Sequence, residues 1–213
     1  MANAVFRLNS MVRASILASG LAAAAAITPA TAQTFSDGYE FLKAIRDRDG
    51  DAVTKVLDQP GSVLVNTRDI SSGETALHIV TERRDLAWVR FLAQKGANPN
   101  IRNKDGNTPL QLAASLGFQE AIEVLMKAGA NIDDSNVAGE TPLITAVHRR
   151  DVPMIRILLA NQADPDRNDN SGRSARDYAE LMTGNTLMMS EFAKADAARE
   201  NDGAAGVTYG PSF

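Results

Sequence analysis

The chain has 213 residues and a formal net charge of −4. This acidic balance excludes a general nucleic-acid binder, because neutralising phosphates requires a basic surface. The sequence contains no cysteine, which excludes disulfides, thiolate metal sites and a cysteine nucleophile. Aromatic residues make up 5% of the chain, so a large globular core built on rings is not expected.

Residues 1–32 predict a secretory signal peptide. They hold two arginines and no acid, and an apolar run follows at 14–27. That run is shorter than the roughly 20 residues of a membrane-spanning helix, and the Ala-x-Ala sequence ending at Ala32 is typical of a cleavage site. We expect cleavage after Ala32, export to the periplasm or the cell exterior, and no membrane insertion afterwards. An uncleaved membrane anchor is the alternative.

A short motif recurs at a fixed interval through the middle of the chain. A glycine with threonine or serine two positions later begins at Gly73, Gly106, Gly139 and Gly172, so successive copies are 33 residues apart. A period of about 20 to 50 residues is typical of stacked repeats, in which each unit buries its apolar face against its neighbours. The chain is therefore predicted to form one solenoid.

Each repeat predicts two helices and a loop. Thr108-Pro109 and Thr141-Pro142 favour the start of a first helix. The threonine hydroxyl can accept a hydrogen bond from a backbone N–H that the first turn leaves free. Proline has no backbone N–H, but at the first helical position that N–H would have no partner within the helix. Apolar residues at helical spacing predict the second helix. The segments rich in Asn, Asp and Pro that follow predict hairpin-like loops. Three apolar columns predict the core: Leu77, Leu110 and Leu143; Val89, Ile122 and Ile155; Leu92, Leu125 and Leu158.

The second helices are expected to end at Gly96 and Gly129, because glycine adopts the left-handed conformation that follows a helix. Gln162 occupies the same position one repeat later. We expect that helix end to be strained or differently capped.

Both ends of the array are expected to be caps. A polar outer face is predicted for the last unit, where Arg176 stands in a leucine column. A capping helix is expected from about Thr186 to Ala195, and the tail at 201–213 is small and polar and is expected to be disordered. The predicted units lie near 39–72, 73–105, 106–138 and 139–171, followed by a C-terminal cap at 172–200 within a repeat domain at 33–200.

Together these features resemble the ankyrin repeat. The segments "TALH" from Thr75 and "GANPN" from Gly96 match the pattern of that family most closely. The resemblance implies an all-α solenoid of stacked helix-turn-helix units with hairpin-like loops, from about Tyr39 to Lys194. It also implies that His78 makes a structural hydrogen bond near the loops. Departures from the family's pattern are Ala76 for proline, Gln111 and Ile144 for histidine, and Gln162 for glycine.

Residues suited to catalysis or metal binding are scarce. The two histidines, His78 and His148, lie in different repeats, and their spacing does not indicate a zinc site. Acid clusters such as Asp133-Asp134 could suggest a calcium loop or a glycosidase pair, but turns also favour these residues. We expect no enzyme activity, no cofactor and no metal.

The resemblance implies that a protein partner is held by the loop tips and the exposed face of the first helices, which form a concave groove. The partner-binding residues predicted in this way are Ser71, Ser72, Glu74, Glu82, Arg83, Lys104, Asp105, Asn107, Ser115, Leu116, Glu140, His148 and Arg149. Phe118 is added as a candidate exposed anchor, because its column holds Asp85 and Asp151, with burial as the alternative. Trp88 shares a mostly apolar column and is expected in the core or at its edge.

Arginines gather along one edge of the predicted groove. Arg83, Leu116 and Arg149 share a column, and Arg84 and Arg150 stand beside it. One interpretation is a groove that recognises an acidic or carboxylate-bearing protein segment, with Leu116 at its apolar centre. The other is a solvated helix end, where basic residues favour the helix dipole.

We therefore expect a monomeric, non-catalytic protein–protein interaction module of the periplasm or cell exterior, without nucleic-acid binding. The alternative is an accessory or protective factor for a periplasmic enzyme in envelope or oxidative stress, which is what the resemblance to some exported bacterial ankyrin proteins implies. Secretion as an effector toward another cell is a third possibility, and the sequence does not name the partner.

Overall fold

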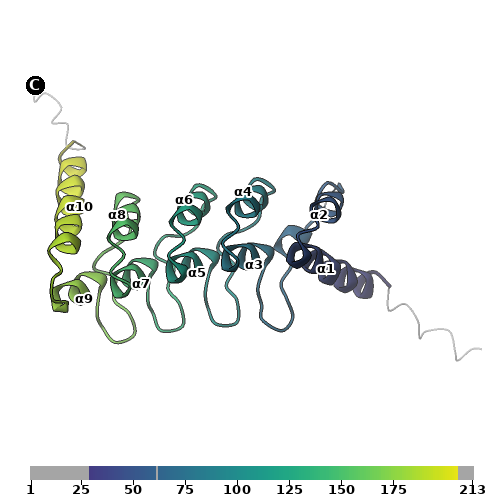
Figure 1. Cartoon of the computed structure of the whole chain (residues 1–213), viewed down its shortest axis with the longest axis horizontal. Coiled ribbons are helices and arrows are strands. Elements are labelled where there is room, and N and C mark those ends of the chain that lie inside the picture. The colour runs from purple at the N-terminus through teal and green to yellow at the C-terminus, as the bar shows by residue number, and fades with distance from the viewer. Residues whose placement is uncertain (1–28, 61, 206–213) are drawn as a thin grey trace, which may run out of the picture. The chain divides into compact units, whose positions relative to one another are not determined.

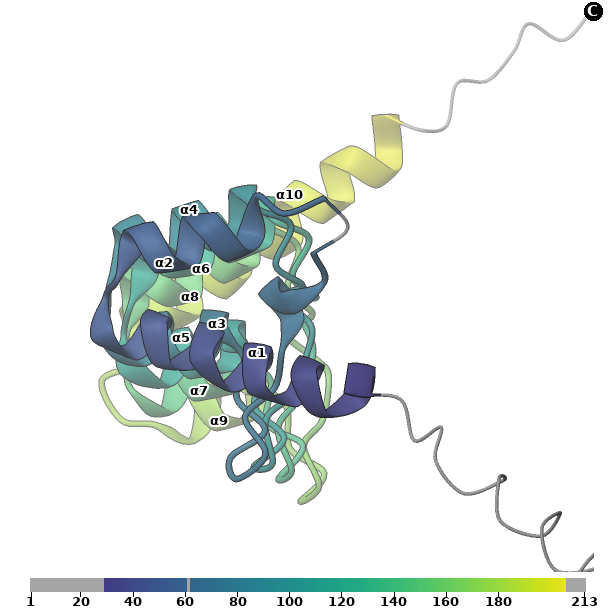
Figure 2. The same ribbon diagram turned by 90° about the vertical axis from the view of Figure 1, so that its right-hand side faces the viewer.

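A computed structural model describes residues 29–60 and 62–205, with side chains described at 37–60 and 62–201. In this part of the chain, helix-turn-helix pairs follow one another from Asp37 onward, with the first helix of each pair in one row and the second in another (Figure 1). A loop after each of the first four pairs projects on the side of the first helices (Figures 1 and 2). The pairs are α1 (Pro29–Asp47) and α2 (Gly50–Leu57), α3 (Ala76–Glu82) and α4 (Leu86–Gln94), α5 (Pro109–Leu116) and α6 (Gln119–Lys127), α7 (Pro142–His148) and α8 (Val152–Ala160), and α9 (Ala175–Leu181) and α10 (Thr186–Ala205), with a short 3-10 helix η1 (Leu64–Asn66) after α2.

Local capping explains where the helices begin. The hydroxyls of Thr108 and Thr141 accept from backbone N–H groups three residues later, each at 3.2 Å, and a proline follows each threonine. In the second helices, the carboxylates of Asp85 and Asp151 cap α4 and α8 in the same way. These bonds satisfy donors that the first turn of a helix leaves free. The predicted helix starts are therefore confirmed.

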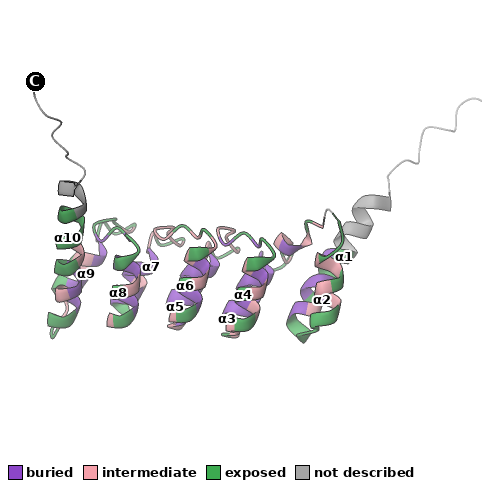
Figure 3. Cartoon of the chain, turned by 90° about the horizontal axis from the view of Figure 1, so that it is seen from above, coloured by how far each residue is buried: buried purple, intermediate pink, exposed green. Residues whose placement is uncertain are grey.

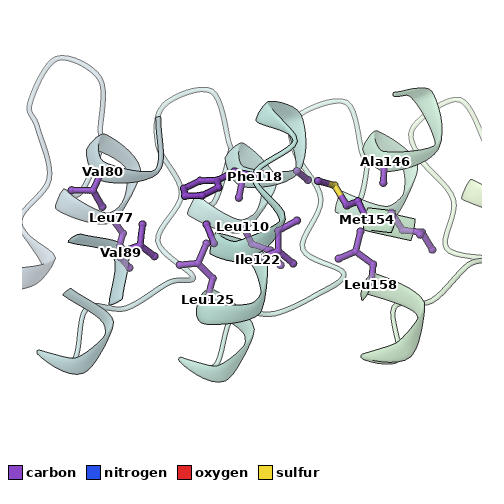
Figure 4. Packing of buried hydrophobic residues seen from close by; sticks show 14 of the residues in the cluster. Leu77, Val80, Val89, Leu110, Phe118, Ile122, Leu125, Ala146, Met154 and Leu158 are labelled. Atoms are coloured by element: carbon purple, nitrogen blue, oxygen red, sulfur yellow. The ribbon is translucent and has the colours of Figure 1, made fainter. Parts of the chain in front are cut away.

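The core lies between the two rows of helices and continues from repeat to repeat. Figure 3 shows buried surfaces facing between neighbouring pairs and exposed residues on the outer sides of the second helices. Figure 4 shows buried side chains of successive repeats in a row along the array, and these residues belong to one hydrophobic cluster. The nine residues of the three predicted apolar columns are all 0% exposed, so each unit buries its apolar face only because a neighbour covers it. The predicted all-α solenoid fold is confirmed.

Each loop closes as a hairpin around one Asn or Asp side chain. The Oδ1 atom of Asn136 accepts from the backbone N–H groups of Ala138 and Glu140 at 2.9 and 3.0 Å, and the backbone N–H of Asn136 donates to the carbonyl of Glu140. Asx side chains favour such turns because they hydrogen-bond to backbone a few residues on. The equivalent side chains in the other loops are Asp69, Asn103 and Asp169.

The end of α8 shows the expected strain. Gln162 has a φ of 70°, close to the values of 80° for Gly96 and 89° for Gly129 at the equivalent positions. A side chain in this left-handed region costs roughly 1–2 kcal/mol. The conformation is kept because the loop that follows must leave the helix in the same direction in every repeat.

The C-terminal cap differs from the prediction in two respects. Helix α10 continues to Ala205, ten residues beyond the expected end at Ala195, and includes the first five residues of the tail expected to be disordered. The rest of that tail lies outside the described residues. Arg176 does not form a polar outer face, because α10 covers it: its guanidinium binds both carboxylate oxygens of Asp196 at 2.9 and 3.0 Å and also pairs with Asp166. These bonds raise the pKa of Arg176.

Most of the expected signal peptide, residues 1–28, lies outside the described residues. Within the described residues, no helix has both the length and the apolar character that crossing a membrane requires.

Candidate protein-binding face

One stripe of side chains crosses each first helix from the base of the preceding loop to the end of the helix. In α7, Nδ1 of His148 lies 3.3 Å from Oε1 of Glu140, so the two ends of the stripe are in contact. The ring of His148 also meets the ring of Tyr178 in α9 edge-on, with centroids 4.4 Å apart. The stripes of the α7 and α9 repeats are therefore in contact, and we call the stripes of the four repeats together the floor.

The floor comprises three positions in each of four repeats. The first precedes the helix, the second lies in its middle, and the third lies at or next to its last residue. The members are Glu74, Ile79 and Glu82; Asn107, Leu112 and Ser115; Glu140, Thr145 and His148; Arg173, Tyr178 and Leu181. All except Ile79 are at least partly exposed.

Chemistry varies along the floor. The α3 repeat contributes two carboxylates, from Glu74 and Glu82, and the α5 repeat contributes only neutral groups around Leu112. Leu116, beside the floor in α5, is half-buried and packs against the core. In the α9 repeat, the guanidinium of Arg173 lies over the ring of Tyr178, 5.8 Å from its centroid.

Neighbouring loops are joined by hydrogen bonds, and their tips lie beside the floor. The backbone N–H of Lys104 donates to the carbonyl of Ser72 at 2.9 Å, and its Nζ donates to the carbonyl of Ile70 at 2.7 Å. Ser71 and Asp105 are exposed at the tips. Asp69 accepts from the hydroxyl and N–H of Ser71 and from Arg46, and these bonds hold the pKa of the carboxyl well below its usual range.

Phe118 is buried, so its prediction as an exposed anchor is wrong. Only 5% of it is exposed. Its column holds Asp85 and Asp151, which are partly exposed because their carboxylates cap the second helices. Phenylalanine has no group that can cap, and its ring instead packs in the core, with the guanidinium of Arg84 5.5 Å from its centroid. Trp88 is half-buried at the core edge, as predicted.

His78 makes the structural hydrogen bonds that were expected. Its Nε2 lies 2.9 Å from the carbonyl of Asn107 in the next repeat, and its Nδ1 lies within 3.2 Å of the N–H and hydroxyl of Thr75. A carbonyl can only accept, so Nε2 carries the hydrogen and Nδ1 accepts. In the next repeat, Gln111 donates from Nε2 to the carbonyl of Glu140 at 3.2 Å and reproduces this link.

Among the described residues, no group of three or more histidine or acidic side chains is placed to hold a metal ion. Two hollows lie instead between second helices, one of about 770 Å³ between α8 and α10 and one of about 530 Å³ between α4 and α6. The chemistry of the loop side is therefore that of an extended surface with hydrogen-bonding, charged and apolar groups.

Two family models match this chain. Ankyrin repeats (3 copies) matches residues 41–136, and Ankyrin repeats (many copies) matches residues 125–179. Both agree with the stacked helix pairs and hairpin loops described above. The chain is an ankyrin-repeat protein.

Known proteins share short stretches with this ankyrin-repeat protein. A Rickettsia felis protein named for ankyrin repeats is 38% identical over 65 residues, which is 29% of each chain. The human 2-5A-dependent ribonuclease is 35% identical over 81 residues, covering 38% of this chain and 11% of the ribonuclease. The yeast oxysterol-binding protein homolog 1 is 32% identical over 76 residues, covering 34% of this chain and 6% of that protein. The chain thus spans less than a third of the length of each of these relatives.

The arginine edge of this ankyrin-repeat protein joins neighbouring repeats. Arg83 donates to the carbonyl of Ile45 in the preceding repeat, and Arg149 donates to the carbonyl of Ser115 at 2.8 Å. Arg84 and Arg150 follow these residues in the left-handed region, with φ of 57° and 55°. Their side chains bind the following repeat instead of the preceding one. Arg84 donates to the carbonyls of Leu116 and Gly117, and Arg150 donates to the carbonyl of Thr183.

Sequence reasoning missed six floor residues: Ile79, Leu112, Thr145, Arg173, Tyr178 and Leu181. Adding 33 to a predicted residue would have located two of them, because Glu140 leads to Arg173 and His148 to Leu181. The contact between His148 and Tyr178 had no sequence signal, since the two residues are 30 positions apart and belong to different columns.

Proposed function

We propose that this ankyrin-repeat protein is a non-catalytic module that binds a segment of a protein partner on the floor and the loop tips. Ankyrin repeats imply protein–protein interaction. The observation that carries the proposal is the continuity of the floor, in which Glu140, His148 and Tyr178 touch across two repeats. A continuous surface of mixed polar and apolar groups suits an extended protein segment better than a small molecule.

The proposed place of action is the periplasm or the cell exterior. It rests on the sequence of residues 1–32, with its basic start, short apolar run and Ala-x-Ala ending. N-terminal sequencing of the protein from the periplasmic fraction tests it, and we expect the chain to start at Gln33. An intact N-terminus at Met1 in a cytoplasmic fraction would overturn the export proposal without affecting the binding proposal.

Site-specific cross-linking tests the binding surface. A photoreactive residue replaces Ser115 at the centre of the floor in the full chain, and a matched variant carries it at Glu123, which is exposed on the outer side of α6. We expect cross-links to one or a few proteins from position 115 and none of these from position 123. The same proteins from both positions, or none from position 115, would contradict the proposal.

The identity of the captured protein separates the two functional alternatives. A single dominant periplasmic enzyme would favour an accessory or protective role in envelope or oxidative stress. Several unrelated proteins that share a sequence segment would favour a general binding module.

A further inference from the structure

The floor has a charge pattern that the sequence did not reveal, because the arginines expected to supply its charge lie elsewhere. Arg149 donates to the carbonyl of Ser115, and its guanidinium packs against Gly117, where a Cβ atom would approach within 2.7 Å of it. Gly117 follows the last residue of α5, so this cation is held at the end of the first helices farthest from the loops. Arg83 is mostly buried and pairs with Asp85.

The charged floor residues of the α3 and α7 repeats, apart from His148, are carboxylates. Glu82 is exposed and forms no ion pair with any residue that the structure describes. Glu74 accepts a hydrogen bond from the hydroxyl of Ser72, which carries no charge. Glu140 accepts from the amide of Asn136 and contacts the ring of His148. Acidic groups thus lie in the α3 and α7 repeats, on both sides of the α5 repeat.

The α5 repeat between them is neutral and partly apolar. Its floor residues are Asn107, Leu112 and Ser115, and half-buried Leu116 lies beside them. Ile79 and Thr145 occupy the equivalent middle positions in the neighbouring repeats. An apolar side chain of a partner would find carbon surface over Leu112, and the guanidinium of Arg149 lies beyond it at the end of α5.

The distance between repeats predicts how charged and apolar residues should be spaced in a partner segment that binds this surface. Packed helices lie about 8–10 Å apart, so the acidic groups of the α3 and α7 repeats are separated by roughly 20 Å. An extended chain rises about 3.3 Å per residue, and roughly six residues therefore cover that distance. A partner segment in this register would place one residue over Leu112 and others, about three residues to each side, over the acidic groups.

We propose that the floor binds an extended basic segment of a partner protein, with one large apolar residue over the α5 repeat and a lysine or arginine about three residues to each side. This deepens the proposed function and rests on it. It differs from the interpretation in which the arginine edge recognises an acidic segment. Opposite charges on the two surfaces favour association and like charges oppose it, so an acidic floor favours a basic partner.

Defined peptides test the proposal on the full chain. Three are matched in length, with glycine and serine elsewhere: one has leucine at the centre and lysine three residues to each side, one replaces both lysines with glutamate, and one replaces the leucine with serine. Nuclear magnetic resonance titration of isotopically labelled protein measures binding. We expect the lysine–leucine peptide to shift the amide signals of Ser115 and His148 and to bind about tenfold more tightly than either of the others.

Charge-neutral variants show whether the carboxylates are responsible. The combined Glu74→Gln, Glu82→Gln and Glu140→Gln variant should bind the lysine–leucine peptide about tenfold more weakly. The control combines Glu120→Gln and Glu123→Gln on the exposed side of α6 and should bind normally. Circular dichroism establishes that both variants are folded.

Equal or tighter binding of the glutamate peptide, or no loss in the triple variant, would overturn the basic-partner proposal. If cross-linking from position 115 still captures a protein in that case, the binding function stands and only the partner's charge is wrong. If the lysine–leucine peptide gives no shifts on the floor, the proposal fails. If position 115 also captures nothing, the binding function fails with it.

Discussion

The guanidinium of Arg149 donates from Nη1 to the backbone carbonyl of Ser115, 2.8 Å away and one repeat earlier. The carbonyl lies near the end of α5, where the last turn of a helix leaves its acceptors free. A side chain in one repeat thus completes the helix end in another. The arginines that could be interpreted from the sequence as a binding edge therefore stabilise the stacking of repeats.

Replacing Arg149 with alanine should therefore destabilise the array. The hydrogen bond is charge-assisted but exposed, so we expect a loss of about 1 kcal/mol in the free energy of unfolding. Urea denaturation measures it. The matched control is Arg90→Ala, at an exposed position of α4, which should change stability by less than about 0.5 kcal/mol. Equal effects of the two changes would show that the link from Arg149 to Ser115 contributes nothing.

His78 should make stability depend on pH near neutrality. Burial lowers the pKa of His78, and Nδ1 accepts hydrogen bonds from Thr75, so protonation would break bonds in the folded state. The unfolded chain binds the proton more readily, and stability should therefore fall as pH decreases below the ordinary histidine pKa of about 6.5.

The variant His78→Gln is the matched comparison for this pH effect, because Gln111 already occupies the equivalent position. Thermal unfolding between pH 8 and pH 5 should show a steeper loss of stability for the wild-type protein than for the variant. The variant should be less stable overall, since the buried Oε1 of Gln111 finds no partner among the described residues. Parallel pH profiles would rule out His78 as the titrating group.

Gln162→Gly should stabilise the protein. The backbone already has a φ of 70° at this position, and glycine adopts that conformation without the strain of a side chain. Part of the gain is offset because glycine makes the unfolded chain more flexible. We expect a net increase of about 0.5–1 kcal/mol by chemical denaturation. The reciprocal change Gly129→Gln should be destabilising, and stabilisation by both changes would contradict the strain argument.

Glu191 should contribute to stability at neutral pH and lose that contribution in acid. Its side chain is 6% exposed and binds Arg156 through both oxygens and Lys194 through one. These bonds lower its pKa from 4.5 to about 2. Because the folded-state pKa lies below the unfolded value, the stabilisation is present above about pH 4.5 and disappears as pH falls toward 2.

The variant Glu191→Gln should therefore be less stable than the wild-type protein by about 1–2 kcal/mol at pH 7, because both partner cations are mostly exposed to solvent. The difference should shrink toward pH 2. Differential scanning calorimetry at several pH values measures this. A difference that stays constant with pH would mean that the charge of Glu191 contributes nothing to stability. Limited proteolysis of the same variant would show whether α10 detaches first.

Much of the fold could be predicted because a sequence pattern that recurs at a fixed interval indicates a structural unit that recurs in the same way. The leucine column at Leu77, Leu110 and Leu143 recurs every 33 residues, and a column can stay apolar only if every layer buries it in the same way. Thr-Pro and Asx signals act over a few residues, so helix starts and loop hairpins followed directly from local sequence. The strained end at Gln162 was predicted for the same reason.

The errors came from residues that depend on contacts outside their own repeat. Phe118 stands in a column of capping aspartates, but burial was decided by the core beside it. Arg176 was expected on a polar outer face because it stands in a leucine column of the last unit, and α10 instead covers it with Asp196. Such contacts join residues whose spacing does not follow the repeat period.

The sequence by itself determined the repeat architecture, the apolar core and the placement of loops, because these depend on periodic and local interactions that every unit repeats. Only the tertiary structure decided which charges remain on the binding face. A guanidinium can bind a partner, a carboxylate or a neighbouring carbonyl, and the choice depends on distances between repeats that residue identity does not contain. Arg83, Arg84, Arg149 and Arg150 link neighbouring repeats, and Glu74, Glu82 and Glu140 remain on the floor.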